Sequence, residues 1–350
     1  MRTLPVTPDT PNLRLLGRMD LSQRPLCLDW TGTGLEARLQ GSGLWAELEA
    51  PETDPVFWMI VLADGCPVAR FPVEPGIRFY PLIIGMEADK TRTISLLKET
   101  QCMPDHPAAT VKIHSLRFEG ELLPLPEYDL TVEFVGDSLT SGEGALAPLG
   151  NEEWITPWFT ARGNYTWYAC QAVNARRRIL SQSGYGVCWS WEHNPKGNMA
   201  EGYEKIVGVL SGPEAEARGC GKPFDFAAQP ADIVCIRLGT NDAGGMNTLQ
   251  SFDQDAPAVT AGCLAFLKKV RACNPGAKIV WILPGSGSHP ELAQNAVSQA
   301  LQEGLEELYT FTLPDYQPEE CGARSHPNAV WNKKAGDLLG DFLKRLVKKA

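Results

Sequence analysis

The chain has 350 residues, which at roughly 150 residues per domain suggests about two domains. Its hydrophobic content of 43% and charged content of 21% match an ordinary globular protein and exclude disorder and fibrous repeats. The net charge is −10, and the longest basic run is the tripeptide at residues 176–178. We therefore expect no nucleic-acid partner.

The chain has no apolar segment long enough for a membrane span. The longest unbroken apolar run, Val56 to Ala63, has eight residues, against roughly 20 for a membrane helix. Pro, Asp and Asn interrupt the first 20 residues, where a secretory signal needs an apolar stretch, so we expect a cytoplasmic protein without a membrane partner. The ten cysteines form no CxxC pair or Cys/His cluster, which predicts reduced thiols, no metal site and no cofactor.

The first third of the chain is predicted to be β structure. Leu35, Ala37 and Leu39 alternate with polar residues, and the pattern repeats after a predicted turn at residues 41–43. Asp64-Gly65 suits a tight hairpin turn between two extended apolar segments. Further strands at 91–98 and 111–118 complete a sandwich or jelly roll. The proline-rich segment after it reads as a linker, so we predict domains at residues 1–126 and 127–350.

The second domain is predicted to be α/β. Its apolar strands TVEFVG, DIVCIRLG and KIVWILPG alternate with helical stretches expected at 258–273, 291–309 and 328–349. This pattern predicts a parallel sheet with helices on both faces. Ligands bind beyond the carboxyl ends of such strands, so the loops after Val135, Leu238 and Leu283 are the places to search for chemistry.

The first of these loops contains Ser138, in the sequence Gly-Asp-Ser-Leu directly after a strand. A serine on a strand-to-helix turn presents its Oγ at the edge of the sheet, where its backbone N–H joins the first donors of the helix. This is the position of a nucleophile. The alternative is a serine that only caps the helix.

Two other loops offer hydrogen-bond donors to an oxyanion. Asn241, in the sequence GTND, follows the next apolar strand and offers a side-chain amide; its alternative is an Asx turn. Gly184, in SQSGYG, offers a backbone N–H with no side chain in the way.

A serine nucleophile needs a base, and the chain has five histidines. His106 and His114 fall in the β domain, whereas His193 and His289 lie in loops of the second domain and stay possible. His326 immediately precedes the last helical stretch, so its loop can reach the same edge of the sheet, and we choose it as the base. The alternative is a polar residue at a helix start, followed by a favoured proline.

Taken together, these four blocks resemble the SGNH (GDSL) hydrolase superfamily, whose members are serine esterases on a flavodoxin-like three-layer fold. Ser138, Gly184, Asn241 and His326 match the four name-giving residues, across about residues 129–350. The resemblance implies that Ser138 is the nucleophile and His326 the base, and that the Ser138 and Gly184 N–H groups and the Asn241 side chain form the oxyanion hole. The β domain, opening with LDWTGTGLEARLQGSGLWAELE, looks like the jelly-roll module of carbohydrate esterase family two, whose members remove O-acetyl groups from plant polysaccharides and their oligosaccharides.

The sequence departs from the superfamily at one position. Members usually have an aspartate three residues before the histidine, where this chain has Ala323. We favour a Ser/His dyad in which a backbone carbonyl accepts the Nδ1–H of the imidazole, as in some members of carbohydrate esterase family two. The alternative is a displaced acid supplied by Asp315, Glu319 or Glu320.

Aromatic side chains near the site are candidates for stacking on sugar rings. Trp154 and Trp158 lie on a long loop after Ser138, and Trp189, Trp191 and Trp331 are further candidates, with packing as the alternative for each. We therefore predict a serine esterase that removes acetyl groups from xylan- or mannan-type oligosaccharides through an acetyl-enzyme intermediate. The alternatives are an esterase for short-chain lipid or other acyl groups on the same site, and a carbohydrate-binding protein with a decayed hydrolase site.

Overall fold

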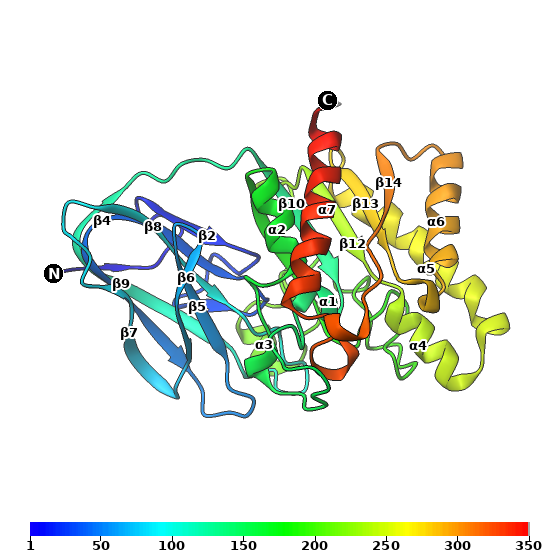
Figure 1. Cartoon of the computed structure of the whole chain (residues 1–350), viewed down its shortest axis with the longest axis horizontal. Helices are drawn as coiled ribbons and strands as arrows, with labels where there is room; N and C mark the ends of the chain where they lie inside the picture. Colours follow the sequence, from blue (N-terminus) through cyan, green and yellow to red (C-terminus); the bar gives the residue numbers. More distant parts are fainter. Residues whose placement is uncertain (349–350) are drawn as a thin grey trace.

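The structure is a computed structural model that describes residues 1–348. An all-β part lies beside an α/β part (Figure 1). The last strand of the first part ends at Leu123 and the first strand of the second begins at Leu130. The predicted boundary between residues 126 and 127 falls in the segment between them, and we call the two parts the β module and the α/β domain.

The β module is a nine-stranded antiparallel network around its own apolar core. The longest strand, β4, is the centre of this network, because it pairs along its length with β2, β8, β7 and β9. Its strands are β1 (Arg2–Pro5), β2 (Leu13–Leu16), β3 (Leu26–Leu28), β4 (Gly34–Ala50), β5 (Trp58–Ala63), β6 (Cys66–Pro72), β7 (Gly76–Ile84), β8 (Thr91–Lys98) and β9 (Val111–Leu123).

Two predicted turns in the β module have different outcomes. Asp64 and Gly65 both have positive φ and join β5 to β6 as an antiparallel hairpin, as predicted. The turn predicted at residues 41–43 is wrong, because β4 runs straight through it. Gly41 and Gly43 flank a register shift against β9, so the glycines mark a β-bulge.

The α/β domain is a parallel five-stranded sheet in the order β11-β10-β12-β13-β14, the order of flavodoxin-like folds. Its strands are β10 (Leu130–Gly136), β11 (Ala175–Ser181), β12 (Ile233–Arg237), β13 (Lys278–Leu283) and β14 (Leu308–Thr312). Its helices are α1 (Ser138–Ser141), α2 (Tyr165–Ala172), α3 (Pro213–Ala217), α4 (Thr240–Leu249), α5 (Phe252–Cys273), α6 (Pro290–Gln302) and α7 (Ala329–Lys348). Helices α2 and α7 cover one face and α5 and α6 the other (Figure 1). The predicted fold class, a jelly-roll-like module followed by a three-layer α/β domain, is confirmed.

Some helix boundaries were predicted incorrectly. The helix expected at 291–309 ends at Gln302, because residues 308–312 form edge strand β14. Helix α5 begins at Phe252, six residues before the predicted start. The predicted end of the last helix at residue 349 lies outside the described residues.

Buried polar contacts join the β module to the α/β domain. Arg18, fully buried, reaches from the loop after β2 to the carboxylate of Glu133 on β10. Burial raises the pKa of Glu133, but Arg18 and then Arg178 outweigh it and lower that pKa to about 2. Trp30 of the β module packs in the core of the α/β domain and donates its indole N–H to the carbonyl of Ile206 at 2.8 Å. The two parts therefore share an interior.

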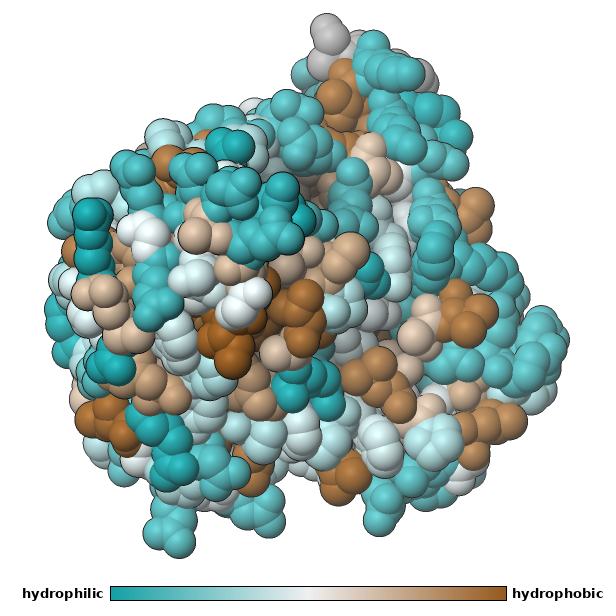
Figure 2. Space-filling model, turned by 60° about the vertical axis from the view of Figure 1, so that its left-hand side comes forward, coloured by the Kyte–Doolittle hydropathy of each residue, from teal (hydrophilic) through white to brown (hydrophobic). Residues whose placement is uncertain are grey.

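Hydrophobic residues form separate spots among hydrophilic ones on the face shown in Figure 2. Across residues 1–348, we find no helix with the length and apolar character to cross a membrane.

Candidate active site

Ser138 lies just beyond the carboxyl end of β10 and is the first residue of α1. Asp137, not Ser138, is the N-cap, since its carboxylate accepts a hydrogen bond from the Leu139 N–H at 3.1 Å. The reading of Ser138 as a helix cap is therefore wrong. Burial raises the pKa of Asp137, and the neighbouring guanidinium of Arg237 opposes that rise. The cap fixes the turn and leaves the Ser138 hydroxyl free for other partners.

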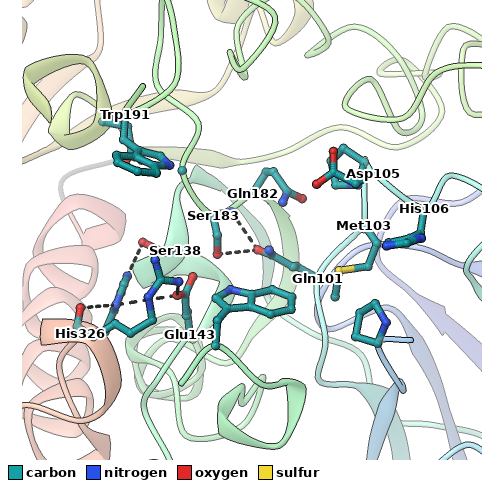
Figure 3. Close-up of a pocket in the computed structure, with 16 residues that line it drawn as sticks. Gln101, Met103, Asp105, His106, Ser138, Glu143, Gln182, Ser183, Trp191 and His326 are labelled. Carbon is teal, nitrogen blue, oxygen red and sulfur yellow. Dashed lines mark hydrogen bonds and ion pairs between the residues drawn. The ribbon is translucent and has the colours of Figure 1, made fainter. Parts of the chain in front are cut away.

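His326 meets Ser138 across the edge of the sheet (Figure 3). Its Nε2 lies 2.7 Å from the Ser138 Oγ, and its Nδ1 lies 3.0 Å from the backbone carbonyl oxygen of Arg324. Because a carbonyl oxygen only accepts, Nδ1 carries the proton and Nε2 is free to accept the serine proton. This tautomer is the one that a general base beside a serine needs.

The loop that carries His326 has an unusual backbone. Arg324 and Ser325 both have positive φ, which turns the Arg324 carbonyl toward the imidazole. Gly144 allows the loop to approach, because a Cβ at that residue would lie 2.7 Å from the Ala323 carbonyl oxygen and 3.1 Å from the His326 Cβ. Ala323 is buried, and its carbonyl accepts the His326 N–H at 2.9 Å.

The sequence did not single out Glu143, which lies beside this pair. Its Oε1 is 4.0 Å from His326 Nδ1 and 3.0 Å from the Arg324 Nη1. It is buried and follows Ser138 by five residues in the sequence. The only available signal was an acidic residue in the glycine-rich turn after the serine.

The three candidates for a displaced acid lie elsewhere in the structure. Among residues 1–348, no hydrogen bond or ion pair joins His326 to Asp315, Glu319 or Glu320. Glu320 instead bonds the backbone of Gln317 and pairs with Lys334. The backbone carbonyl therefore occupies the place that an acid would take, with Glu143 next to it.

The three predicted oxyanion donors lie around one pocket with Ser138 and His326. The backbone N–H groups of Ser138 and Gly184 have no acceptor among the described residues. Gly184 has φ of 79°, a conformation that glycine adopts at little cost. Asn241 uses one amide hydrogen to bond the carbonyl of Tyr185 at 2.9 Å, which orients its side chain. Its second amide hydrogen stays available to a ligand.

The pocket has a volume of about 410 Å³ and is walled by both parts of the chain. One side is the α/β domain with Ser138 and His326, and the other is the β module, which contributes Pro55, Gln101, Met103, Pro104, Asp105 and His106. The contribution of the β module was not predicted from the sequence.

The tryptophan candidates separate by burial. Trp154 (37% exposed) and Trp191 (50% exposed) line the pocket. Trp331 is 1% exposed and bonds the Pro314 carbonyl, and Trp189, 8% exposed, bonds the Asp242 carbonyl. Neither of these two side chains lines the pocket. The prediction that Trp189 and Trp331 stack on the substrate is therefore wrong. Trp158 is half-buried and does not line the pocket either.

This geometry is that of a serine hydrolase: a nucleophilic serine, a histidine in the correct tautomer, and donors around a pocket. Residues 134–316 match the GDSL-like Lipase/Acylhydrolase family, and the chain belongs to that family.

The likeness to solved structures extends beyond these residues to the whole chain. An acetyl xylan esterase (Est2A) from the rumen bacterium Butyrivibrio proteoclasticus has a structure with 27% identity and a TM-score of 0.93, covering 99% of this chain and 98% of that one. A family two carbohydrate esterase from Clostridium thermocellum shares the fold at 19% identity and a TM-score of 0.81, with coverage of 96% and 99%. The resemblance to carbohydrate esterase family two indicated by the sequence is thereby confirmed.

A curated relative, "Acetylxylan esterase / glucomannan deacetylase" from Cellvibrio japonicus, is 24% identical over 238 residues. The match spans 66% of this chain and 62% of that relative.

Proposed function

We propose that this chain is a serine esterase that removes O-acetyl groups from plant-polysaccharide-derived oligosaccharides of the xylan or mannan type. One observation carries the proposal: Ser138 Oγ lies 2.7 Å from a histidine nitrogen whose ring is held in the accepting tautomer. The Butyrivibrio relative is an acetyl xylan esterase and the Cellvibrio relative is an acetylxylan esterase / glucomannan deacetylase, which supports acetyl esters of carbohydrates as the substrates.

The reaction follows from the positions of these groups. Ser138 Oγ attacks the acetyl carbonyl carbon while His326 Nε2 takes its proton. The Ser138 and Gly184 N–H groups and the Asn241 amide receive the oxyanion of the tetrahedral intermediate. His326 then gives the proton to the departing sugar oxygen, leaving an acetyl group on Ser138. Water attacks this acetyl-enzyme by the same steps and releases acetate.

The pocket suits a polar leaving group. Polar side chains from both parts line it, including Asp105 of the β module and Gln182 of the α/β domain, and these can hydrogen-bond the hydroxyl groups of a sugar. Trp154 and Trp191 offer partly exposed rings for stacking on the C–H face of a sugar ring. The acetyl group is small and offers few contacts. The polar side chains and the two tryptophan rings that contact the sugar therefore determine which alcohol is accepted.

The experiment follows acetate release by NMR from acetylated xylo- and manno-oligosaccharides. We expect Ser138→Ala to lower turnover by about 10⁵ to 10⁶, since it removes the covalent route. Ser298→Ala is the matched control, because Ser298 is exposed on α6 and its loss should leave turnover unchanged. Residual activity of Ser138→Ala within tenfold of the parent would overturn the assignment.

An acyl-chain series tests the substrate class. We expect nitrophenyl acetate to react faster than esters with acyl chains of about eight carbons, because polar side chains such as Asp105, Gln182 and Asn241 line the pocket and disfavour a long apolar chain. An equal rate along the series would favour an esterase for lipid or other acyl groups, and the absence of turnover on every ester would favour a binding protein.

We also propose a cytoplasmic location, which makes imported oligosaccharides the substrates. The ten cysteines are free, and Cys66 is exposed; free exposed thiols are typical of reducing compartments. Fractionation of the source cells tests the location, and enzyme found outside the cytoplasmic membrane would contradict it.

A further inference from the structure

The loop after β11 carries the N–H of Gly184, and its shape depends on a few contacts. It belongs to no helix or strand. The N–H of Gln182 bonds the carbonyl of Gly136, and Asn241 bonds the carbonyl of Tyr185. Between these two fixed points lies Ser183, the residue directly before Gly184.

Ser183 is held by a side chain of the β module. The Oε1 of Gln101 accepts hydrogen bonds from both the backbone N–H and the Oγ–H of Ser183, each at 2.9 Å (Figure 3). No other described residue accepts a hydrogen bond from either group. Gln101 therefore fixes the backbone of Ser183. Because the Gly184 N–H belongs to the peptide bond between Ser183 and Gly184, Gln101 also influences the direction in which that N–H points.

Gln101 is itself immobilised. It is 1% exposed, and its backbone carbonyl accepts a hydrogen bond from the ammonium of Lys98 at 2.9 Å. The same ammonium, fully buried, bonds the carbonyls of Asp29 at 2.6 Å and Thr100 at 2.5 Å. The ammonium of Lys98 thus bonds three backbone carbonyls of the β module, and one of them belongs to Gln101 itself.

We propose that Gln101 is a positioning residue for the oxyanion hole, so that the β module helps to build the catalytic geometry of the α/β domain. The inference rests on the proposed function, because an oxyanion hole serves acyl transfer. Gln101 acts through Ser183 on the direction of the Gly184 N–H. Its effect belongs to the transition state, where negative charge develops on the substrate oxygen.

The expected magnitude lies below the loss of a whole donor. Removing one oxyanion donor typically costs 10² to 10³ in kcat, and misplacing a catalytic group by about 1 Å costs roughly 10². Gln101→Met keeps the length and burial of the side chain but removes the acceptor of both bonds. We therefore expect kcat for an acetyl ester to fall by about 10 to 100 fold, with KM within about threefold of the parent.

Amide hydrogen exchange read by mass spectrometry supplies a second measurement that needs no activity. In Gln101→Met the Ser183 N–H loses its acceptor, so a peptide covering residues 182–186 should exchange at least about tenfold faster. Peptides from β11 and β12 should be unchanged. Gln171→Met is the matched control, since Gln171 is exposed on α2 and makes no side-chain hydrogen bond to the described residues; it should alter neither measurement.

Ser183→Ala keeps the proposal testable if Gln101→Met fails to fold. It removes one of the two bonds and leaves the backbone bond, so we expect a measurable loss of kcat and a measurable rise in exchange, each smaller than in Gln101→Met. Unchanged exchange and unchanged kcat in either variant would overturn the proposal. A change in KM alone would also overturn it, because it would mark Gln101 as a residue that only contacts the substrate.

The proposed function and this inference fail separately. If the parent hydrolyses no acyl ester, the proposed function falls, while the exchange measurement still decides whether Gln101 orders the loop. If the parent is an active esterase and Gln101→Met raises exchange without lowering kcat, the positioning role is refuted and the esterase stands.

Discussion

Replacing Glu143 by glutamine tests whether His326 depends on a backbone carbonyl or on an acid. The Nδ1 of His326 lies 3.0 Å from the Arg324 carbonyl oxygen and 4.0 Å from the Glu143 carboxylate. Only the shorter distance is a hydrogen bond. Glu143→Gln therefore leaves the tautomer and the ring position of His326 unchanged.

The remaining effect of Glu143 is electrostatic. A full negative charge 4.0 Å from a protonated imidazole would contribute about 4 kcal/mol at an effective dielectric constant near 20, or about 10³ in rate. The guanidinium of Arg324 lies 3.0 Å from the same carboxylate and offsets most of this attraction. We therefore expect kcat/KM of Glu143→Gln to stay within about tenfold of the parent, whereas loss of the acid of a true triad costs about 10⁴.

Arg324→Met is the control variant. This substitution removes the ion pair between Arg324 and Glu143 but keeps Glu143. The backbone carbonyl of residue 324 still bonds His326, and residue 324 must still adopt a positive φ. If the ion pair serves to anchor the loop, both variants should lose activity equally. A loss of 10³ or more in Glu143→Gln, with Arg324→Met near the parent, would show that Glu143 is the acid and refute the dyad. The assay is hydrolysis of nitrophenyl acetate at saturating and limiting substrate.

Three further predictions concern the site and the stability of the fold. Asn241→Ala should lower kcat by about 10² to 10³ with a smaller change in KM, since its bond strengthens as charge develops on the substrate oxygen; an effect on KM alone would contradict this. Asp315→Asn, Glu319→Gln and Glu320→Gln should each keep activity within about tenfold of the parent, because none contacts His326; a loss of 10³ in one would identify a displaced acid. Glu133→Gln should weaken the pH dependence of the urea midpoint. The pKa of Glu133 is about 2 in the fold against an ordinary 4.5, so its stabilising contribution is full above about pH 4.5 and is lost as the pH falls toward 2. A parent midpoint that is flat between about pH 5 and 3 would refute this reasoning.

The sequence predicted strands that are mostly apolar and missed one that is rich in charge. Strands β10, β12 and β13 are mostly apolar, with Glu133 as the one charged residue of β10, and each was predicted. Strand β11 contains three consecutive arginines, yet it pairs with β10 and forms one edge of the parallel sheet. Arg178 pairs with the buried Glu133, and Arg176 and Arg177 donate to the carbonyls of Leu15 and Ala161. These partners lie far away in the sequence, so no local pattern announces that the charges are satisfied.

The same limit divides the site. Ser138, Gly184, Asn241 and His326 each occupy a local motif at a strand end or before a helix, and a parallel sheet brings such ends to one edge. The sorting of the tryptophans depends on burial instead. Trp154 and Trp331 are both tryptophans close to motif residues, but Trp154 lines the pocket, whereas Trp331 lies on the buried face of α7 and packs in the core. Only tertiary packing separates these two environments.

The boundary between the two parts of the chain divides the topology but not the site. Gln101 bonds the loop of Gly184, Arg18 pairs with Glu133 in the strand that leads to Ser138, and Pro55 and His106 face the pocket. The Gln101–Ser183 and Arg18–Glu133 contacts join residues that are 82 and 115 positions apart in the sequence. A module whose buried side chains fix the catalytic loop cannot move as an independent binding domain without disturbing the chemistry. The β module therefore forms one wall of the active site. Substitutions in its interior, at Lys98 or Gln101, should lower kcat more than substitutions on its outer surface.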